Sequence, residues 1–399
     1  MFGNRTQGKL VFRQSRGGGL LEKQDSYHMI TTLKNDEKNP YRIKEQNMLS
    51  LAEYQHHLYR QPRLKYLFFE LTDRCNLNCL HCGSGCTAAN GTFLPLTAIK
   101  QTLNRVAEAY SSNNIMVCIT GGEPLLHKDF FRIIRYAKTL GFSVGITTNG
   151  TLIDDRAAEK LTYAGLDTIA VSIDGLGDVH DKFRQISGSF DKAVAAIHSL
   201  KKVGIEPQVI TVVHSGNIDS LDEMFGFMRS EDIYSWRLVN VEPIGRTNIN
   251  KDILLSADQL KGLFDFIRAK RWDNENDMDI TYGCSHFLTY EYENTIRDYY
   301  FQCMAGTMTA SIMANGDIGA CLDIERRPDL VQGNIFRDDF VDIWENRFHS
   351  FRTDRTLKSK TCRDCEFQKV CLGDSAHTWD YDNNEPLYCV SIQRRRNMI

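Results

Sequence analysis

The sequence lacks a long apolar run. No stretch of the 399 residues approaches the roughly 18 uninterrupted apolar residues that a membrane-spanning helix needs. The N-terminus, MFGNRTQGKLVFRQSRGGGL, has no apolar core after its basic residues, so we expect no secretory signal and a cytoplasmic location. With 42% apolar residues, the chain can bury a large core and has room for one big domain with appendages.

The sequence also lacks an excess of charge of either sign. Its 48 basic and 51 acidic residues give a net charge of −3 and a pI near 6.4. This balance argues against an extensive nucleic-acid interface. The one basic run, RRR at 394–396, lies at the C-terminal tip, where we expect a solvated tail. We therefore expect neither nucleic acid nor a membrane as a partner.

Cysteine, in contrast, is abundant and unevenly placed. Of 12 cysteines, four lie in 75–86, seven in 284–389, and only Cys118 lies between. Disulfides are not expected in a reducing compartment. Clustered cysteines in an intracellular chain favour metal or iron–sulfur ligation.

The middle of the chain alternates strand-like and helix-like segments. The apolar, β-branched runs are 64–72, 115–120, 142–148, 168–174, 207–213 and 236–241, and the amphipathic segments between them lie near 97–110, 129–140, 154–164, 189–203, 219–230 and 256–270. Continuous apolar strands that alternate with helices predict a parallel sheet with covered faces. Six such units are too few for a closed eightfold barrel, so we predict an α/β fold with an open, partial (β/α)6 TIM-like barrel.

The pattern divides the chain into three parts. Residues 1–63 form a polar N-terminal extension of uncertain fold, whose one candidate helix covers 45–59. Residues 64–275 form the partial barrel. Residues 276–399 are loop-rich, with a hairpin turn expected at NGD (315–317) and seven cysteines that suggest a second domain held together by metal.

Three cysteines follow the first predicted strand directly. Cys75, Cys79 and Cys82 have C-x3-C-x2-C spacing on the loop after YLFFELT. A zinc site would need a fourth ligand, which His81 or Cys86 could supply. A cubane iron–sulfur cluster held by three cysteines instead keeps one iron open for a substrate or cofactor.

The motifs that follow identify a family resemblance. GGEP (121–124) ends the second strand, TTNG (147–150) the third and VSIDG (171–175) the fourth, and HDKFRQISGSFDKAVAAI (180–197) comes next. With the three cysteines in this order, residues 64–275 resemble the radical S-adenosylmethionine (SAM) superfamily. The resemblance implies a [4Fe–4S] cluster on Cys75, Cys79 and Cys82 that reductively cleaves SAM to a 5′-deoxyadenosyl radical.

The resemblance also assigns the SAM-binding residues. It implies that Gly121, Gly122 and Glu123 lie by the methionine amine of SAM, where glycine lets the backbone approach closely. It implies that Ser172 and Arg184 lie by the carboxylate, for which a guanidinium is a suitable anchor. Without a role in SAM binding, Arg184 would be expected to form a surface ion pair and Ser172 to be a hydroxyl at the edge of the sheet.

The second cysteine set resembles the SPASM extension of the same superfamily. Its spacing is Cys303-x12-Gly316-x4-Cys321, then Cys362-x2-Cys365-x5-Cys371, then Cys389. The resemblance implies two auxiliary [4Fe–4S] clusters. Alone, CRDCEFQKVC would also fit half of a zinc ribbon.

One position departs from the SPASM pattern, because Ser375 stands where the family has a cysteine. By analogy, Auxiliary II takes a complete ligand set: Cys362, Cys365, Cys371 and Cys389. Auxiliary I takes Cys303, Cys321 and Cys284, and either keeps an open iron or is completed by Asp374, Ser375 or His377. Two cysteines remain. We expect Cys118 to be a packed core thiol and Cys86 to be structural, unless Cys86 serves as a catalytic hydrogen donor.

The resemblance implies an oxidoreductase that matures a ribosomally made peptide by cross-linking, thioether formation or epimerisation. Sulfatase-maturase-like protein oxidation fits less well, because His81 stands where those enzymes have an aromatic residue. Action on a small molecule and a non-catalytic iron–sulfur or zinc protein also stay open. Expected partners are a precursor peptide or protein and an electron donor such as flavodoxin or ferredoxin. The 63 N-terminal residues are too short and too polar to match the usual leader-binding domain, so three alternatives for leader binding stay open: this extension, a separate leader-binding protein, or the barrel itself.

Overall fold

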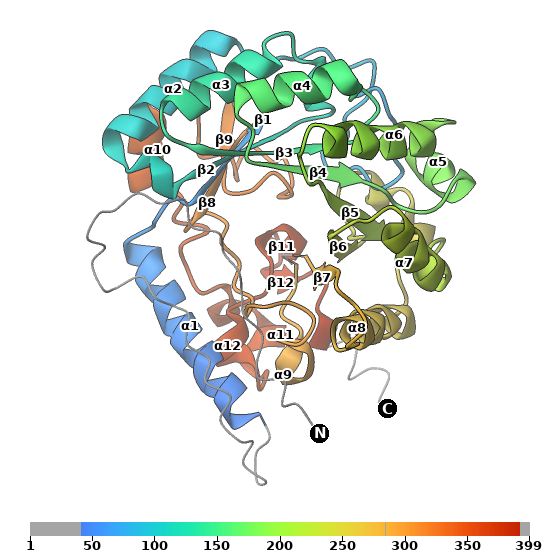
Figure 1. Ribbon diagram of the computed structural model, residues 1–399. Helices are drawn as coiled ribbons and strands as arrows, with labels where there is room; N and C mark the ends of the chain where they lie inside the picture. Colours follow the sequence, from blue (N-terminus) through green and yellow to red (C-terminus); the bar gives the residue numbers. More distant parts are fainter. Residues whose placement is uncertain (1–40, 284, 392–399) are drawn as a thin grey trace, which may run out of the picture. The chain divides into compact units, whose positions relative to one another are not determined.

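The computed structural model describes residues 41–283 and 285–391. Contacts divide the chain into two units, Met1–Ile43 and Lys44–Ile399, and every strand of the described residues lies in the second unit. The main feature of this unit is a ten-stranded sheet in the order β10-β9-β8-β1-β2-β3-β4-β5-β6-β7 (Figure 1). The strands are β1 Tyr66–Glu70, β2 Met116–Thr120, β3 Ser143–Thr148, β4 Thr168–Ser172, β5 Gln208–Val213, β6 Ser235–Asn240, β7 Asp279–Tyr282, β8 Thr309–Ile312, β9 Asp317–Gly319 and β10 Gly333–Asn334. A separate hairpin pairs β11 (Trp379–Asp380) with β12 (Glu385–Pro386).

Helices follow most of the parallel strands. They are α1 Arg42–Arg60, α2 Leu96–Ala109, α3 Phe130–Thr139, α4 Asp155–Ala164, α5 Asp178–Arg184, α6 Ser189–Lys202, α7 Leu221–Ser230, α8 Ala257–Arg271, α9 Thr289–Tyr292, α10 Phe340–Asn346, α11 Lys360–Arg363 and α12 Gln368–Cys371. Figure 1 shows α2, α3, α4 and α6 to α8 along the outer side of the curved sheet. Among the described residues, no helix is long and apolar enough to cross a membrane.

The architecture confirms the predicted α/β partial barrel. β1 to β7 are all parallel, and the sheet remains open because β10 and β7 are its edges. All six predicted strands are present, as is the candidate helix over 45–59, which lies within α1. The predicted hairpin is also present: β8 and β9 are antiparallel, and Gly316, with φ of 84°, lies in the turn.

The sheet continues beyond residue 275, where the sequence pattern changes. β7 pairs with β6, while β8 pairs with β1 at the other side of the barrel strands. Strands from the C-terminal third therefore extend the sheet at both ends. The boundary between 64–275 and 276–399 stays a prediction.

Local sequence signals explain where the helices begin and end. Asp154 caps α4 by accepting a hydrogen bond from the Ala157 amide, and Gly165 ends it in a left-handed conformation. Ser256 and Gln259 form a reciprocal capping box at the start of α8. On β2, Val117 and Ile119 are buried in the same apolar core as the helix residues, whereas Cys118 lies on the other, half-buried face.

Candidate functional site

The three cysteines of the first motif lie together on the loop that leaves β1. Cys75 and Cys79 are 8% and 7% exposed, and Cys82 is half-buried. They pack with Leu77 and Cys86 in one small cluster. Burial raises the pKa of Cys75 to about 12, so without metal this thiol stays protonated at neutral pH. Three converging thiols on one loop suit a [4Fe–4S] cluster with one iron left for another ligand.

The glycine pair after β2 lies directly against this loop. The Gly122 amide donates to the Thr72 carbonyl at 2.7 Å. A Cβ on Gly122 would lie 2.1 Å from the Arg74 carbonyl oxygen, and one on Gly121 would lie 2.7 Å from the Thr72 carbonyl oxygen. Any side chain here would push the end of β2 away from the cysteine loop. The structure therefore explains both glycines by close backbone approach.

Glu123 ties the end of β2 to the end of β3. Its buried carboxylate accepts hydrogen bonds from the amides of Leu125 (3.2 Å) and Asn149 (2.9 Å) and from the Thr148 hydroxyl (2.9 Å). Burial raises its pKa to about 7 despite these donors. Glu123 thus holds the ends of β2 and β3 together beside the glycine pair.

Arg184 bridges a carboxylate and a cluster cysteine. Its Nε donates to Asp174 at 2.5 Å and its Nη1 donates to the Cys79 Sγ at 3.5 Å. Both members of the ion pair are buried, and the Val212 amide also donates to Asp174 at 2.8 Å. Arg184 therefore lies inside the site and not in a surface ion pair. Ser172 ends β4 nearby in sequence and is also buried.

The other two cluster cysteines also receive hydrogen bonds. The Leu77 amide donates to the Cys75 Sγ at 3.4 Å, and the Asn149 side chain approaches the same sulfur at 4.0 Å. A hydrogen bond from Cys86 lowers the pKa of Cys82 to about 5 and raises that of Cys86. Cys86 is almost fully buried beside Cys82, and its structural role stays a prediction.

Three buried charged residues at this side of the barrel were missed by sequence reasoning. Asp174 lies within the VSIDG motif, and Glu70 ends the apolar run YLFFE. Glu70 forms an ion pair with Arg326 and accepts from the Ala314 amide. A carboxylate at the end of an otherwise apolar strand was the available signal, because such a group needs a buried partner. Its partner is 256 residues away and could not be named.

The third missed residue is Glu242, just after β6. It contacts two histidines: His377 at 2.5 Å and His286 at 3.0 Å, while the other ring nitrogen of His286 lies 3.1 Å from Asp374. Although burial opposes the cations, Asp374 and Glu242 raise the pKa of His286 to about 10, and Glu242 raises that of His377 to about 9. These four side chains, which we call the Glu242 chain, join the barrel to the C-terminal region.

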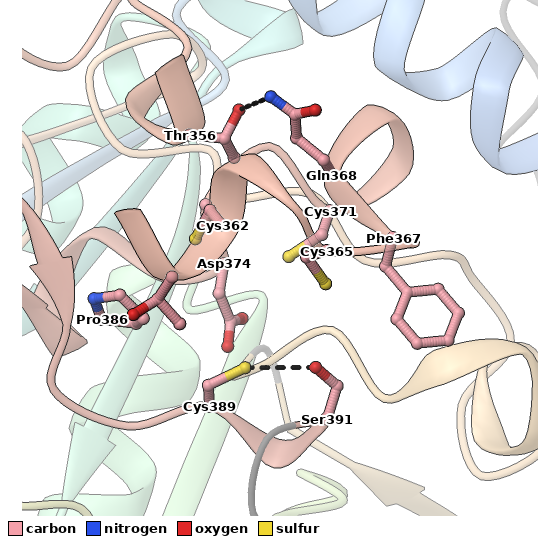
Figure 2. A pocket seen from close by; sticks show the side chains of 12 residues that line it. Thr356, Cys362, Cys365, Phe367, Gln368, Cys371, Asp374, Pro386, Cys389 and Ser391 are labelled. Carbon is pink, nitrogen blue, oxygen red and sulfur yellow. Dashed lines mark hydrogen bonds between the residues drawn. The ribbon is translucent and has the colours of Figure 1, made fainter. Parts of the chain in front are cut away.

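The cysteines assigned to Auxiliary II line a single pocket. Figure 2 shows Cys362, Cys365, Cys371 and Cys389 around it, with Asp374 at its wall. Burial raises the pKa of Cys362 to about 11 and also raises the pKa of Cys371 well above its ordinary value. Four thiols from α11, from α12, from the turn between these helices and from the C-terminal segment fit a [4Fe–4S] cluster with complete thiolate ligation.

The residues assigned to Auxiliary I are only partly described. Cys284 lies outside the described residues. The Ala376 amide donates to the Cys303 Sγ at 3.4 Å, which places segment 375–376 beside this cysteine. The Asp374 carboxylate is bound by His286 and the Phe287 amide, and His377 is bound by Glu242. The Ser375 hydroxyl accepts a weaker hydrogen bond, at 3.3 Å, from the His286 amide. Cys321 is half-buried after β9.

Comparisons with known proteins define the class. The profile of the Radical SAM superfamily matches residues 69–228, and that of the SPASM iron-sulfur cluster-binding domain matches residues 303–366. This chain belongs to the radical SAM superfamily and carries a SPASM domain. It is therefore a radical SAM enzyme of the oxidoreductase type, whose cofactors are SAM, a [4Fe–4S] cluster and auxiliary iron–sulfur clusters.

Particular relatives fall into two groups. The AdoMet-dependent heme synthase of Methanosarcina barkeri is 30% identical over 355 residues, which cover 82% of this chain and 96% of that protein. The mycofactocin maturase MftC of Mycolicibacterium smegmatis is 29% identical over 312 residues, which cover 77% of this chain and 76% of that protein.

Two solved structures share the fold. The enzyme anSMEcpe with bound AdoMet has a TM-score of 0.66 at 20% identity and covers 83% of this chain and 95% of its own. Streptococcus suis SuiB bound to S-adenosylmethionine has a TM-score of 0.65 at 19% identity, and the match covers 84% of this chain and 78% of SuiB. The likeness extends over both the barrel and the SPASM region.

Proposed function

We propose that this enzyme modifies a ribosomally made peptide by a cross-link, a thioether or an epimerisation. The observation that carries this proposal is that four basic side chains at this side of the barrel are paired with buried carboxylates, which leaves Arg246, a donor to Asn78, as a basic residue beside the cysteine loop without an ion pair within the described residues. Arg184 is paired with Asp174, Arg326 with Glu70, and both His286 and His377 with Glu242. A substrate with several carboxylates needs cations left over for it, whereas a largely neutral polypeptide does not.

The similarity to the maturase MftC supports this proposal, because it runs through both domains. The fold is also shared with SuiB bound to precursor peptide SuiA and with anSMEcpe bound to a peptide. When bound, SAM and the reduced cluster supply a carbon radical that abstracts a hydrogen atom. The residues of this chain hold the site: Arg184 and the glycine pair shape the loop, and Glu123 fixes the strand ends around it.

A second candidate is the oxidation of a tetrapyrrole side chain. The heme synthase of Methanosarcina barkeri favours it, since that relative is matched over 96% of its length. For this reaction, the ion pairs around the strand ends would have to open to bind propionate groups. Both candidates need an electron donor, so the substrate is what distinguishes them.

One experiment separates the two. Anaerobically reconstituted enzyme, SAM and a reductant are incubated with a precursor peptide encoded beside the gene, or with iron coproporphyrin III. We expect 5′-deoxyadenosine in step with loss of two hydrogens from the peptide, or with deuterium uptake from heavy water if the change is an epimerisation. An unchanged peptide together with 5′-deoxyadenosine-coupled conversion of the porphyrin would overturn the proposal. A Cys75→Ala variant is the control for reactions that do not need the cluster.

A further inference from the structure

The inner face of the curved sheet is only partly covered. On β2, β5 and β6, alternate residues are buried, and the residues between them are half-buried. The buried set packs largely in the core shared with the helices, which Figure 1 shows on the outer side of the sheet. The half-buried set therefore faces the inside of the barrel. Among the half-buried residues of these three strands, Arg237 on β6 is the one that carries a charge at neutral pH.

The direction of the Arg237 side chain follows from its neighbours. Trp236 and Leu238, on either side of it, are fully buried in the core, and Trp236 packs against Phe266 of α8. Arg237 therefore points to the inner face. On β2, burial raises the pKa of Cys118 to about 12, and the Arg237 guanidinium opposes this shift. Because β3, β4 and β5 lie between β2 and β6 in the sheet, these two side chains interact across the inside of the barrel.

Arg237 also lies close to the SAM-binding end of the barrel. Ser172, the last residue of β4, is in register with Ile210 on β5, and Ile210 is in register with Arg237 on β6. Residues in register two strands apart are separated by about 10 Å. Ser172 is one of the two residues that the family resemblance places by the SAM carboxylate. A molecule bound to Arg237 would therefore lie inside the barrel, beside the cofactor.

Arg237 has no counter-charge in the part of the chain that the structure describes. There its guanidinium forms neither an ion pair nor a hydrogen bond, whereas Arg184 and Arg326 are both paired. None of its nitrogens is a fully buried atom without a partner, so the group remains accessible. The Cys118 thiol supplies no anion, because it stays protonated at neutral pH. A half-buried guanidinium that lacks a counter-charge is stabilised when an anion binds to it.

We propose that Arg237 binds a carboxylate of the substrate and so determines which part of the peptide enters the barrel. A guanidinium matches a carboxylate with two parallel hydrogen bonds. Ile210 and Val239, on the same face, offer apolar contact to the carbon atoms next to that carboxylate. One guanidinium serves one carboxylate, which suits the largely neutral peptide of the proposed function, on which this inference rests. The carboxylate belongs to an acidic side chain or to the peptide C-terminus.

The test combines Arg237→Gln with changes to the peptide carboxylates. Three forms of the precursor peptide encoded beside the gene are compared: the natural peptide, its C-terminal amide, and a form with Asn and Gln in place of its acidic residues. We expect Arg237→Gln to raise KM for the natural peptide by about tenfold or more, with a smaller change in kcat. Loss of the bound carboxylate should raise the wild-type KM by a similar factor and leave Arg237→Gln unaffected. The form that does so identifies the carboxylate.

The matched control is Arg156→Gln, which removes an exposed guanidinium from α4 and should match wild type with every peptide. Iron content and 5′-deoxyadenosine formation without peptide, with dithionite as the reductant, should match wild type in Arg237→Gln. If Arg237→Gln loses iron, Arg237→Lys replaces it. Lysine keeps the charge but not the paired hydrogen bonds, so a smaller rise in KM is expected.

Two results would overturn the proposal. One is a KM that responds equally to carboxylate removal in wild type and in the iron-replete variant, including no response in either. The other is loss of SAM cleavage by the iron-replete variant without peptide, because Arg237 would then bind SAM. If wild type converts iron coproporphyrin III and no peptide, the proposed function fails separately. The same comparison is then made with the porphyrin and its methyl ester, and the same two results would overturn the role of Arg237.

Discussion

Arg184 shows how one side chain can act on the cluster from outside its ligand set. The guanidinium has five N–H donors, of which Nε binds Asp174 and Nη1 binds Cys79. Other N–H groups are left for the SAM carboxylate that the family resemblance places there. The reduced cluster carries one more negative charge than the oxidised cluster, so a fixed cation and N–H donor beside a ligand sulfur favours reduction.

We therefore predict that Arg184→Gln lowers the reduction potential of the SAM-site cluster, measured by EPR-monitored titration without SAM. The change also leaves the buried Asp174 carboxylate unpaired, which should cost about 3 kcal/mol of stability. The double variant Arg184→Gln/Asp174→Asn separates the two effects: it should recover stability but not the potential of wild type. Equal potentials in wild type and Arg184→Gln would show that the Cys79 contact has no electronic role.

By the SPASM analogy, a thiolate at position 375 would complete Auxiliary I, and fewer thiolates generally raise a reduction potential. We expect one auxiliary cluster to have the higher potential, and Ser375→Cys to shift it downward in voltammetry and to change its EPR signal. Ser375→Ala is the control for loss of the hydroxyl. If Ser375→Cys matches wild type in potential and in substrate turnover, Ser375 is not near an iron.

The cysteines could be predicted from their spacing. The residues that contact this site from distant parts of the sequence could not. Cys75, Cys79 and Cys82 form one local motif, and the GGEP glycines are required by close contacts at the end of β2. Asp174, although it lies in a motif, was missed because the resemblance assigned its partner Arg184 to the SAM carboxylate. The contact between Arg326 and Glu70 joins residues far apart in the chain, and no periodicity or spacing encodes it.

At the scale of elements, the strands of the barrel were predictable from their continuous apolar runs, and its helices were predictable from the amphipathic segments between them. Both apolar strands and amphipathic helices were found within a few residues of their observed bounds. From β7 onward, only the turn of the β8–β9 hairpin was predicted, because the other elements have two to seven residues and no period that a sequence can display. They are fixed by side-chain contacts such as the Glu242 chain.

The Glu242 chain predicts how stability depends on pH. His286 and His377 have folded pKa values of about 10 and about 9, above the ordinary value of 6.5. Their contribution is therefore fully present below the ordinary value and is lost as pH rises through about 9 to about 10. Glu242 has a lowered pKa, so its contribution is present above its ordinary value of 4.5 and is lost in acid.

We expect the thermal midpoint of the reconstituted enzyme to fall as pH rises through that alkaline window. His377→Gln should be destabilised near neutral pH by about 3 kcal/mol and should show a shallower alkaline decline. The control is His198→Gln, which removes a histidine from an exposed pair with Glu231. If wild type and His377→Gln decline in parallel, the buried histidines are neutral in the folded protein.

At the scale of the whole molecule, the barrel and the SPASM region share one sheet, since β8 pairs with β1. The loop after β1, which carries Cys75, and the segment after β9, which carries Cys321, therefore both leave the same sheet. Three cubane clusters should give about twelve irons per chain after anaerobic reconstitution, measured by iron and sulfide assay. A measured content of about eight irons per chain would show that Auxiliary I does not form. About four irons with bound zinc would assign Cys362, Cys365 and Cys371 to a zinc ribbon.

The function of the whole molecule depends on the loop after β1 holding the cluster that cleaves SAM. The most direct measurement is 5′-deoxyadenosine formation by the triple variant Cys75→Ala/Cys79→Ala/Cys82→Ala with dithionite as the reductant. The iron content of the same variant is measured as well. We predict loss of about four irons, no 5′-deoxyadenosine, and auxiliary clusters whose EPR signals match wild type. A triple variant that still cleaves SAM when reduced would contradict this assignment of the loop.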